Sequence, residues 1–86
     1  MYFVYILISK SYNRRYVGMT NNIKRRFKEH NSGRMKSTKA FTPWEIIYVE
    51  KFPIRIEARK REKYFKSAAG RRYLKSKFGS AGYLPN

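Results

Sequence analysis

Blocks of apolar and polar residues along this 86-residue chain predict three strands. Residues 2–8 are almost entirely aromatic or β-branched, which is typical of a buried strand. The polar residues 9–13 predict a turn, and residues 14–17 then pair back as the second strand of a hairpin that ends at Gly18. The third apolar run, residues 44–52, predicts a third strand that follows a basic, polar loop.

Helical signals fill the remaining segments. Residues 20–22 are good N-cap types, so they predict a helix to about Asn31, and Gly33 stands where a glycine would end it. Pro53 can open a second helix over residues 54–67 because its missing N–H is not needed there.

Gly70 is expected to break this second helix, and residues 71–78 predict a short third helix. The order of elements predicts an α+β fold, a small three-stranded antiparallel sheet flanked by helices. We expect one domain over residues 1–78 with one modest core, and a flexible tail over residues 79–86.

The composition supports a packed domain, since 42% of residues are hydrophobic and 17% are aromatic. The chain has no cysteine, which excludes disulfides and thiolate metal sites. The longest apolar run, residues 3–8, is too short to span a membrane and lacks the flanking features of a signal peptide. A cytoplasmic protein is the simplest expectation, with association with the nucleoid left open.

Charge is the second strong signal, because 21 Lys and Arg face only five acidic residues and the net charge is +16. Such an imbalance points to a polyanionic partner, and nucleic acid is favoured over a membrane surface or a ribosome-associated role. We expect DNA, with RNA left open and no membrane partner. The residues expected to contact phosphates are Arg14, Arg15, Lys24, Arg25, Lys28, Lys36, Lys39, Arg59 and Lys63.

Candidate chemistry begins in the first predicted helix, where Arg26 precedes His30 by one turn beside the apolar stripe of Ile23 and Phe27. An arginine at a core boundary is costly unless it meets an anion. Glu29 is the only local carboxylate and is expected to project to a different side. The alternative is that Arg26 extends its charged end into solvent.

Two tyrosine motifs precede this helix, Phe3-Val4-Tyr5 and Tyr16-Val17-Gly18. Tyr5 and Tyr16 are expected to face each other across the hairpin, and without further information they could be ordinary core aromatics. Together with Arg26, His30 and the distant Glu62, their order and spacing resemble the GIY-YIG nuclease family in its small, stand-alone form, over roughly residues 1–78.

The resemblance implies a metal-dependent endonuclease whose site contains Tyr5, Tyr16, Arg26, His30 and Glu62. It implies Tyr5 as general base, Tyr16 and His30 as orienting or proton-sharing groups, and Arg26 as the phosphate ligand. Glu62 would hold a single Mg²⁺ or Mn²⁺, four residues after an alanine as in the family's metal-binding helix. The alternative for Glu62 is a solvated carboxylate paired with Arg59, Lys63 or Lys66.

The small number of carboxylates limits which metal-dependent nuclease mechanisms the chain could use. The chain has no aspartate, and its other glutamates are scattered at positions 29, 45, 50 and 57, which argues against a site with several acidic ligands. One histidine and no cysteine exclude an ordinary zinc cage. A nucleic-acid-binding module without strong catalysis is the second hypothesis, and the oligomeric state and preferred DNA structure are left open.

The chain also departs from the family pattern. Phe3 replaces the glycine of the first motif, and Val17 replaces an isoleucine in the second. Met19 stands where repair nucleases of the family carry a lysine, so that role is lost or has moved to Arg14 or Arg15.

Overall fold

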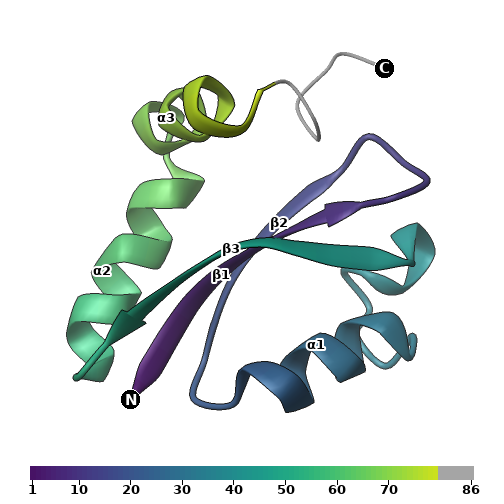
Figure 1. Cartoon of the computed structure of the whole chain (residues 1–86), viewed down its shortest axis with the longest axis horizontal. Helices are drawn as coiled ribbons and strands as arrows, with labels where there is room; N and C mark the ends of the chain where they lie inside the picture. Colours follow the sequence, from purple (N-terminus) through teal and green to yellow (C-terminus); the bar gives the residue numbers. More distant parts are fainter. Residues whose placement is uncertain (80–86) are drawn as a thin grey trace.

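A three-stranded antiparallel sheet forms the centre of the protein, whose computed structural model describes residues 1–79 (Figure 1). The strands are β1 (Tyr2–Ser9), β2 (Arg15–Thr20) and β3 (Trp44–Phe52), in the spatial order β2-β1-β3. The most apolar strand, β1, is therefore central and paired on both sides. The α+β fold predicted from the sequence is confirmed.

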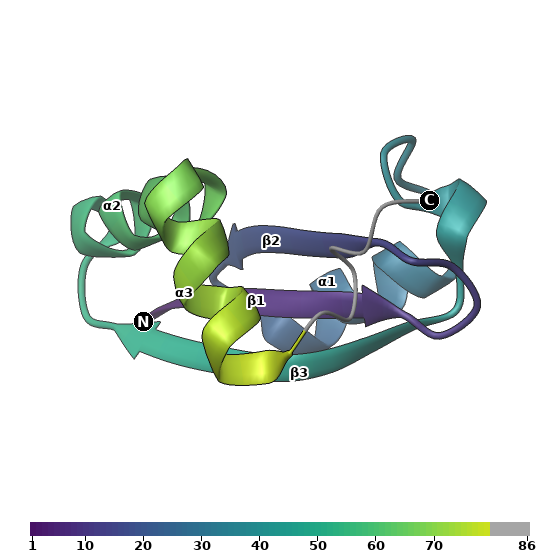
Figure 2. The same ribbon diagram turned by 90° about the horizontal axis from the view of Figure 1, so that it is seen from above.

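Each face of the sheet carries its own apolar cluster, because successive side chains of a strand point to opposite faces. Val4 and Ile6 of β1 pack with residues of α2 (Arg55–Lys66) and α3 (Ala68–Phe78). Tyr5 and Leu7 face the opposite way, toward Trp44 and α1 (Ile23–Asn31). Figure 2 shows α3 in front of the sheet and α1 behind it. The expectation of one core was wrong, since the sheet separates two.

Local signals account for α1. The Asn22 side chain accepts a hydrogen bond from the Arg25 backbone N–H at 3.1 Å and so caps the helix as predicted. After the helix, Gly33 adopts a φ of +81°, in the left-handed region that favours glycine. Strand β2 differs from its prediction, because it runs through Gly18 to Thr20 instead of ending at Gly18.

The loop between α1 and β3 is tied to the sheet and not simply solvated. Asn31 closes it with two hydrogen bonds to the backbone of Trp44, one to its carbonyl at 3.1 Å and one from its N–H at 2.6 Å. The Trp44 indole N–H donates to the Thr38 carbonyl at 2.9 Å. A short 3₁₀ turn, Lys39–Phe41, adds order that the sequence did not predict.

The break between the second and third helices lies at Ser67 and not at Gly70. Ser67 caps α3, its hydroxyl accepting from the Gly70 N–H at 3.1 Å, so α3 begins at Ala68 instead of residue 71. Gly70 is buried in the first turn, where a Cβ would lie 1.8 Å from the Tyr64 carbonyl oxygen. The glycine therefore allows two helices to pack closely. Of the predicted tail, residues 80–86 lie outside the described residues.

We expect Gly70→Ala to destabilise the protein by about 3 kcal/mol or more, because the new methyl would overlap backbone atoms that cannot move independently. Elsewhere in a helix, alanine is favoured over glycine by about 1 kcal/mol. A loss of unfolding free energy in Gly70→Ala would therefore point to the packing at this position and not to helix propensity. Urea unfolding of both variants measures this, with Ala69→Gly as the control at the exposed neighbouring position. A stabilised Gly70→Ala variant would contradict the packing seen here.

Candidate active site

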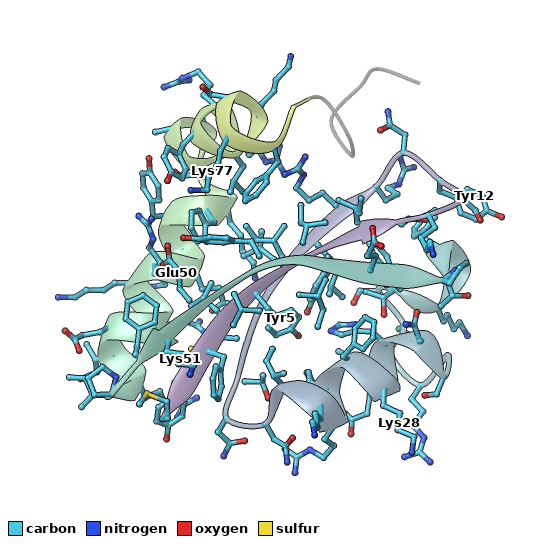
Figure 3. The ribbon with its side chains drawn as sticks, in the orientation of Figure 1. Tyr5, Tyr12, Lys28, Glu50, Lys51 and Lys77 are labelled. Atoms are coloured by element: carbon cyan, nitrogen blue, oxygen red, sulfur yellow. The ribbon has the colours of Figure 1, made fainter. Side chains whose placement is uncertain are left out.

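Tyr5 lies across a glycine of the neighbouring strand. It is opposite Gly18 in the β1–β2 ladder, and a Cβ at Gly18 would be 2.4 Å from the Tyr5 hydroxyl oxygen. Only a residue without a side chain leaves room for the phenol there. Tyr5 and Tyr16 are thus diagonal neighbours on one face and not a directly opposed pair, with ring centroids 6.2 Å apart. Figure 3 shows Tyr5 on the side of the sheet that α1 covers.

The Tyr5 hydroxyl is hydrogen-bonded to a buried imidazole. Its oxygen lies 2.8 Å from Nε2 of His30, and Nδ1 of that ring lies 3.0 Å from the Thr38 hydroxyl oxygen. Burial and, to a smaller extent, the nearby Arg26 charge lower the pKa of His30 to about 4, so the ring is neutral at pH 7. A neutral imidazole donates from one nitrogen and accepts at the other.

One tautomer of His30 fits all of these contacts. We assign it because the Thr38 hydroxyl can donate to the Met35 carbonyl, 3.5 Å away, and its oxygen can then accept from Nδ1–H of His30. Nε2 then carries the lone pair and accepts from the Tyr5 hydroxyl. Tyr5 therefore has a proton acceptor already in hydrogen-bond contact. Thr38 is fully buried and was not predicted as a site residue, because nothing in its local sequence distinguishes it.

Two charged groups from different helices act on this hydroxyl. Burial and the neighbouring Tyr16 raise the pKa of Tyr5 well above its usual value. A hydrogen bond from Arg26 and its charge oppose that shift, whereas the Glu62 carboxylate adds to it. The structure thus brings all five predicted catalytic residues into one site, although they lie on two strands and two helices.

The Arg26 guanidinium forms an ion pair with Glu29 of the same helix. Its Nη1 donates to Glu29 at 3.1 Å, so the expectation that Glu29 projects elsewhere was wrong: an i, i+3 pair shares one helix face. About a third of the Arg26 side chain (37%) remains exposed. Because a guanidinium has five N–H donors, Arg26 keeps donors for a phosphate while bound to Glu29.

Glu62 is buried and ion-paired. One carboxylate oxygen lies 2.9 Å from Lys66 Nζ and the other 3.6 Å from Arg59 Nη1, which are two of the partners that the alternative interpretation named. The carboxylate is not solvated, however, because only 12% of its side chain is exposed. Within residues 1–79, no group of three metal-ligating side chains exists. Glu62 could hold a hard divalent ion only with water and substrate oxygens as further ligands.

Glu50 does not supply a second carboxylate to this site. Burial would raise the pKa of Glu50, but hydrogen bonds from Arg61 at 2.9 and 3.1 Å and from Tyr48 at 2.5 Å lower it. Figure 3 shows Glu50 beside α2, away from Tyr5. This cluster joins β3 to α2 and is best described as part of the fold.

Eight of the nine predicted phosphate-contacting residues are exposed, and Arg15 is half-buried. The Arg15 guanidinium lies 5.9 Å from the centre of the Phe78 ring and donates to the Gly79 carbonyl at 3.4 Å. Arg14 lies over the Phe41 ring at 4.8 Å. Lys66 was named only as an ion-pair partner, yet it contacts the proposed metal ligand directly.

Over residues 1–79 no helix is long and apolar enough to cross a bilayer. The sheet order places β2, with Tyr16 and Gly18, at one edge of the sheet. The candidate site is therefore built at a sheet edge.

Comparisons with known proteins identify the family of this chain. Residues 1–75 match the family model described as the GIY-YIG catalytic domain. A UPF0213 protein of Listeria innocua is 46% identical over 66 residues, covering 76% of this chain and 72% of its own length. One from Bacillus licheniformis is 41% identical over 66 residues, covering 72% and 68% respectively. The solution NMR structure of a UPF0213 protein from Bacillus halodurans, 34% identical, has a TM-score of 0.54 and covers 92% of this chain and 87% of that one.

The chain therefore belongs to the GIY-YIG family, among the UPF0213 proteins, as the tyrosine motifs predicted. This catalytic domain defines a nuclease superfamily whose members generally use divalent metal ions and act on nucleic acid.

Proposed function

We propose that this protein is a DNA endonuclease that hydrolyses phosphodiester bonds with one divalent cation, Mg²⁺ or Mn²⁺. The observation that carries the proposal is the buried Tyr5–His30 hydrogen bond, on whose hydroxyl both Arg26 and Glu62 act. A tyrosine that served only as a core residue would need neither a buried histidine nor charges of both signs around its hydroxyl.

The proposed reaction uses Tyr5 as the general base. Tyr5 accepts a proton from the attacking water while its own hydroxyl proton passes to Nε2 of His30. The water oxygen forms a bond to phosphorus as the bond to the leaving oxygen breaks, and the leaving oxygen takes a proton from a solvent water. Arg26 balances the charge on the phosphate. A divalent cation at Glu62 would supply further positive charge, which favours the ionised forms of nearby phenols and water.

The donor set at Glu62 fits such an ion. It offers two carboxylate oxygens on a side chain that is 12% exposed, beside the half-exposed Lys66, and a hard divalent cation prefers oxygen ligands of this kind. The Lys66 ammonium already balances the charge of this carboxylate, and a divalent cation could take over that role.

A second candidate function is a nucleic-acid-binding module with weak or no catalysis, since a net charge of +16 alone favours nucleic acid. A pure binder has no use for the Tyr5–His30–Thr38 arrangement, which lies beneath the surface. We therefore favour the enzyme.

The experiment is a cleavage assay on duplex, nicked, branched and single-stranded DNA, with and without Mg²⁺ or Mn²⁺. Arg26→Ala should lose cleavage, whereas Arg25→Ala, the neighbouring position on α1, should only weaken binding modestly. Metal-dependent products that disappear in Arg26→Ala support the proposal. Tight binding with no cleavage of any substrate under any metal condition would establish the binding module instead.

We also expect removal of Lys66 to tighten metal binding. A cation at Glu62 must displace the Lys66 ammonium, whose side chain is 53% exposed. An ion pair with one partner in solvent contributes about 0.2–1 kcal/mol, so Lys66→Met should bind Mn²⁺ up to about fivefold more tightly. Titration of free Mn²⁺ by electron paramagnetic resonance measures this. Lys63→Met removes the same charge from an exposed position on α2 and is the control. Equal tightening in both variants would mean that only overall charge matters.

A further inference from the structure

Two basic hollows lie at opposite ends of the edge strand β2. The first, of about 300 Å³, is lined at the start of β2 by Arg15 and Tyr16 and on the helices by Lys66 and Arg71. The second, of about 330 Å³, is lined at the end of β2 by Thr20 and Asn21 and on the helices by Arg25, Arg26 and Arg55. Each hollow thus contains one residue of the candidate active site.

The candidate active site connects the two hollows. Tyr16 lines the first hollow and Arg26 the second. Between them in β2 is Gly18, directly beneath the Tyr5 hydroxyl. Lys66 links the first hollow to the proposed metal ligand, because its ammonium lies 2.9 Å from Glu62. A strand that followed β2 would therefore pass from one hollow, over the site, into the other.

The charge of both hollows selects a polyanion. Three basic side chains line each hollow, and no carboxylate lines either. From Arg15 to Thr20, β2 rises by about 17 Å at roughly 3.3 Å per residue. One DNA strand carries a phosphate about every 3.4 Å along the duplex axis, so this length spans several consecutive phosphates.

We propose that the two hollows bind phosphates of one strand on opposite sides of the scissile phosphate, separated from each other by several linkages. The inference rests on the proposed function, since it places the scissile phosphate between Arg26 and Glu62. Arg71 and Lys66 hold the flanking phosphate on one side, and Arg55 and Arg25 hold the one on the other. None of Arg55, Lys66 and Arg71 was among the phosphate contacts predicted from the sequence.

The test measures DNA affinity without metal and so needs no turnover. Arg71→Gln is compared with Arg72→Gln, which removes the same charge at the next, exposed position of α3 but does not line the hollow. Only Arg71→Gln should weaken binding appreciably, up to about fivefold at low salt. It should also lower the slope of log K against log salt by about 0.7 to 0.9, the value for one phosphate contact.

The positions of the bound phosphates are mapped with a set of oligonucleotides. Each carries one neutral methylphosphonate linkage, at a different position in each oligonucleotide. Wild-type protein should lose affinity when the linkage is neutral at either flanking site. Arg71→Gln should no longer sense the linkage on one side, and Arg55→Gln should no longer sense it on the other. The affinity of Arg26→Gln should not change when the neutral linkage lies between these two positions. That result locates the scissile phosphate whether or not cleavage occurs.

Equal weakening by Arg71→Gln and Arg72→Gln would overturn the inference in favour of diffuse charge attraction. The inference would also be overturned if Arg71→Gln and Arg55→Gln both lost their sensitivity to the neutral linkage on the same side of the central position. The two proposals fail separately: a correct map without any metal-dependent cleavage refutes the nuclease and keeps the two subsites, whereas cleavage with no such map refutes the subsites alone.

Discussion

Glu62→Gln is expected to lower DNA cleavage by at least about a thousandfold while the protein stays folded. A metal ion stabilises a phosphoryl-transfer transition state by several kcal/mol, and each 1.36 kcal/mol is a factor of ten in rate. Glutamine keeps the size of the side chain and can still accept a hydrogen bond from Lys66, so the packing of α2 should not change. Single-turnover cleavage with saturating Mg²⁺, together with thermal unfolding, measures both effects.

Glu57→Gln is the matched control, because it removes the same charge from an exposed position on the same helix. It should cleave DNA at the wild-type rate. In the absence of metal, Glu62→Gln should bind DNA as well as wild type or slightly better, since a negative charge facing phosphate is lost. If it instead weakens metal-free binding as much as the loss of a lysine does, Glu62 is a structural ion-pair residue for Lys66 and Arg59, and the metal site lies elsewhere.

Tyr5→Phe should reduce turnover by about 10²- to 10⁴-fold, the usual contribution of a general base. The ring still fills its place over Gly18, but the hydroxyl that joins His30 to the attacking water is gone. His30 then loses a buried hydrogen-bond partner, which should cost about 1–3 kcal/mol of stability. Rapid-quench cleavage, DNA affinity and urea unfolding separate these effects, and DNA affinity should stay unchanged.

Tyr48→Phe controls for the removal of a hydrogen-bonded phenol. Its hydrogen bond to Glu50 and burial raise the pKa of Tyr48 to about 12, so it too is a perturbed tyrosine, but it packs with the α2 and α3 cluster. This variant should lose some stability and keep its cleavage rate. Comparable losses of rate in both variants would show that Tyr5 acts through stability instead of chemistry.

Local sequence patterns were enough to predict the three strands, the three α-helices and their order. Strand preference is set by residue type and near neighbours, so the aromatic and β-branched runs at residues 2–8 and 44–52 located strands within a residue of their observed ends. The cap at Asn22 and the turn at Gly33 were also correct, because capping is a local interaction. The tyrosine motifs and their spacing to Arg26 sufficed to predict the family.

Glycines showed where local reasoning fails. Gly18 and Gly70 were both predicted to end elements, yet each lies inside one, where the missing Cβ admits a neighbour. The neighbour of Gly18 is the ring of Tyr5, thirteen positions away, and that of Gly70 is the backbone of Tyr64 in another helix. A sequence shows that a residue lacks a side chain but not what occupies the space.

The candidate site divides in the same way. The sequence identified which residue types could perform the chemistry, because tyrosine, arginine, histidine and glutamate have fixed chemical capacities. The contacts themselves depend on the folded structure: the Tyr5 hydroxyl bonds to His30, Thr38 bonds to the other ring nitrogen, and Lys66 pairs with Glu62. Hydrogen bonds and ion pairs act over a few ångströms, so their partners are chosen by the packing of α1 and α2 around the sheet and not by spacing along the chain.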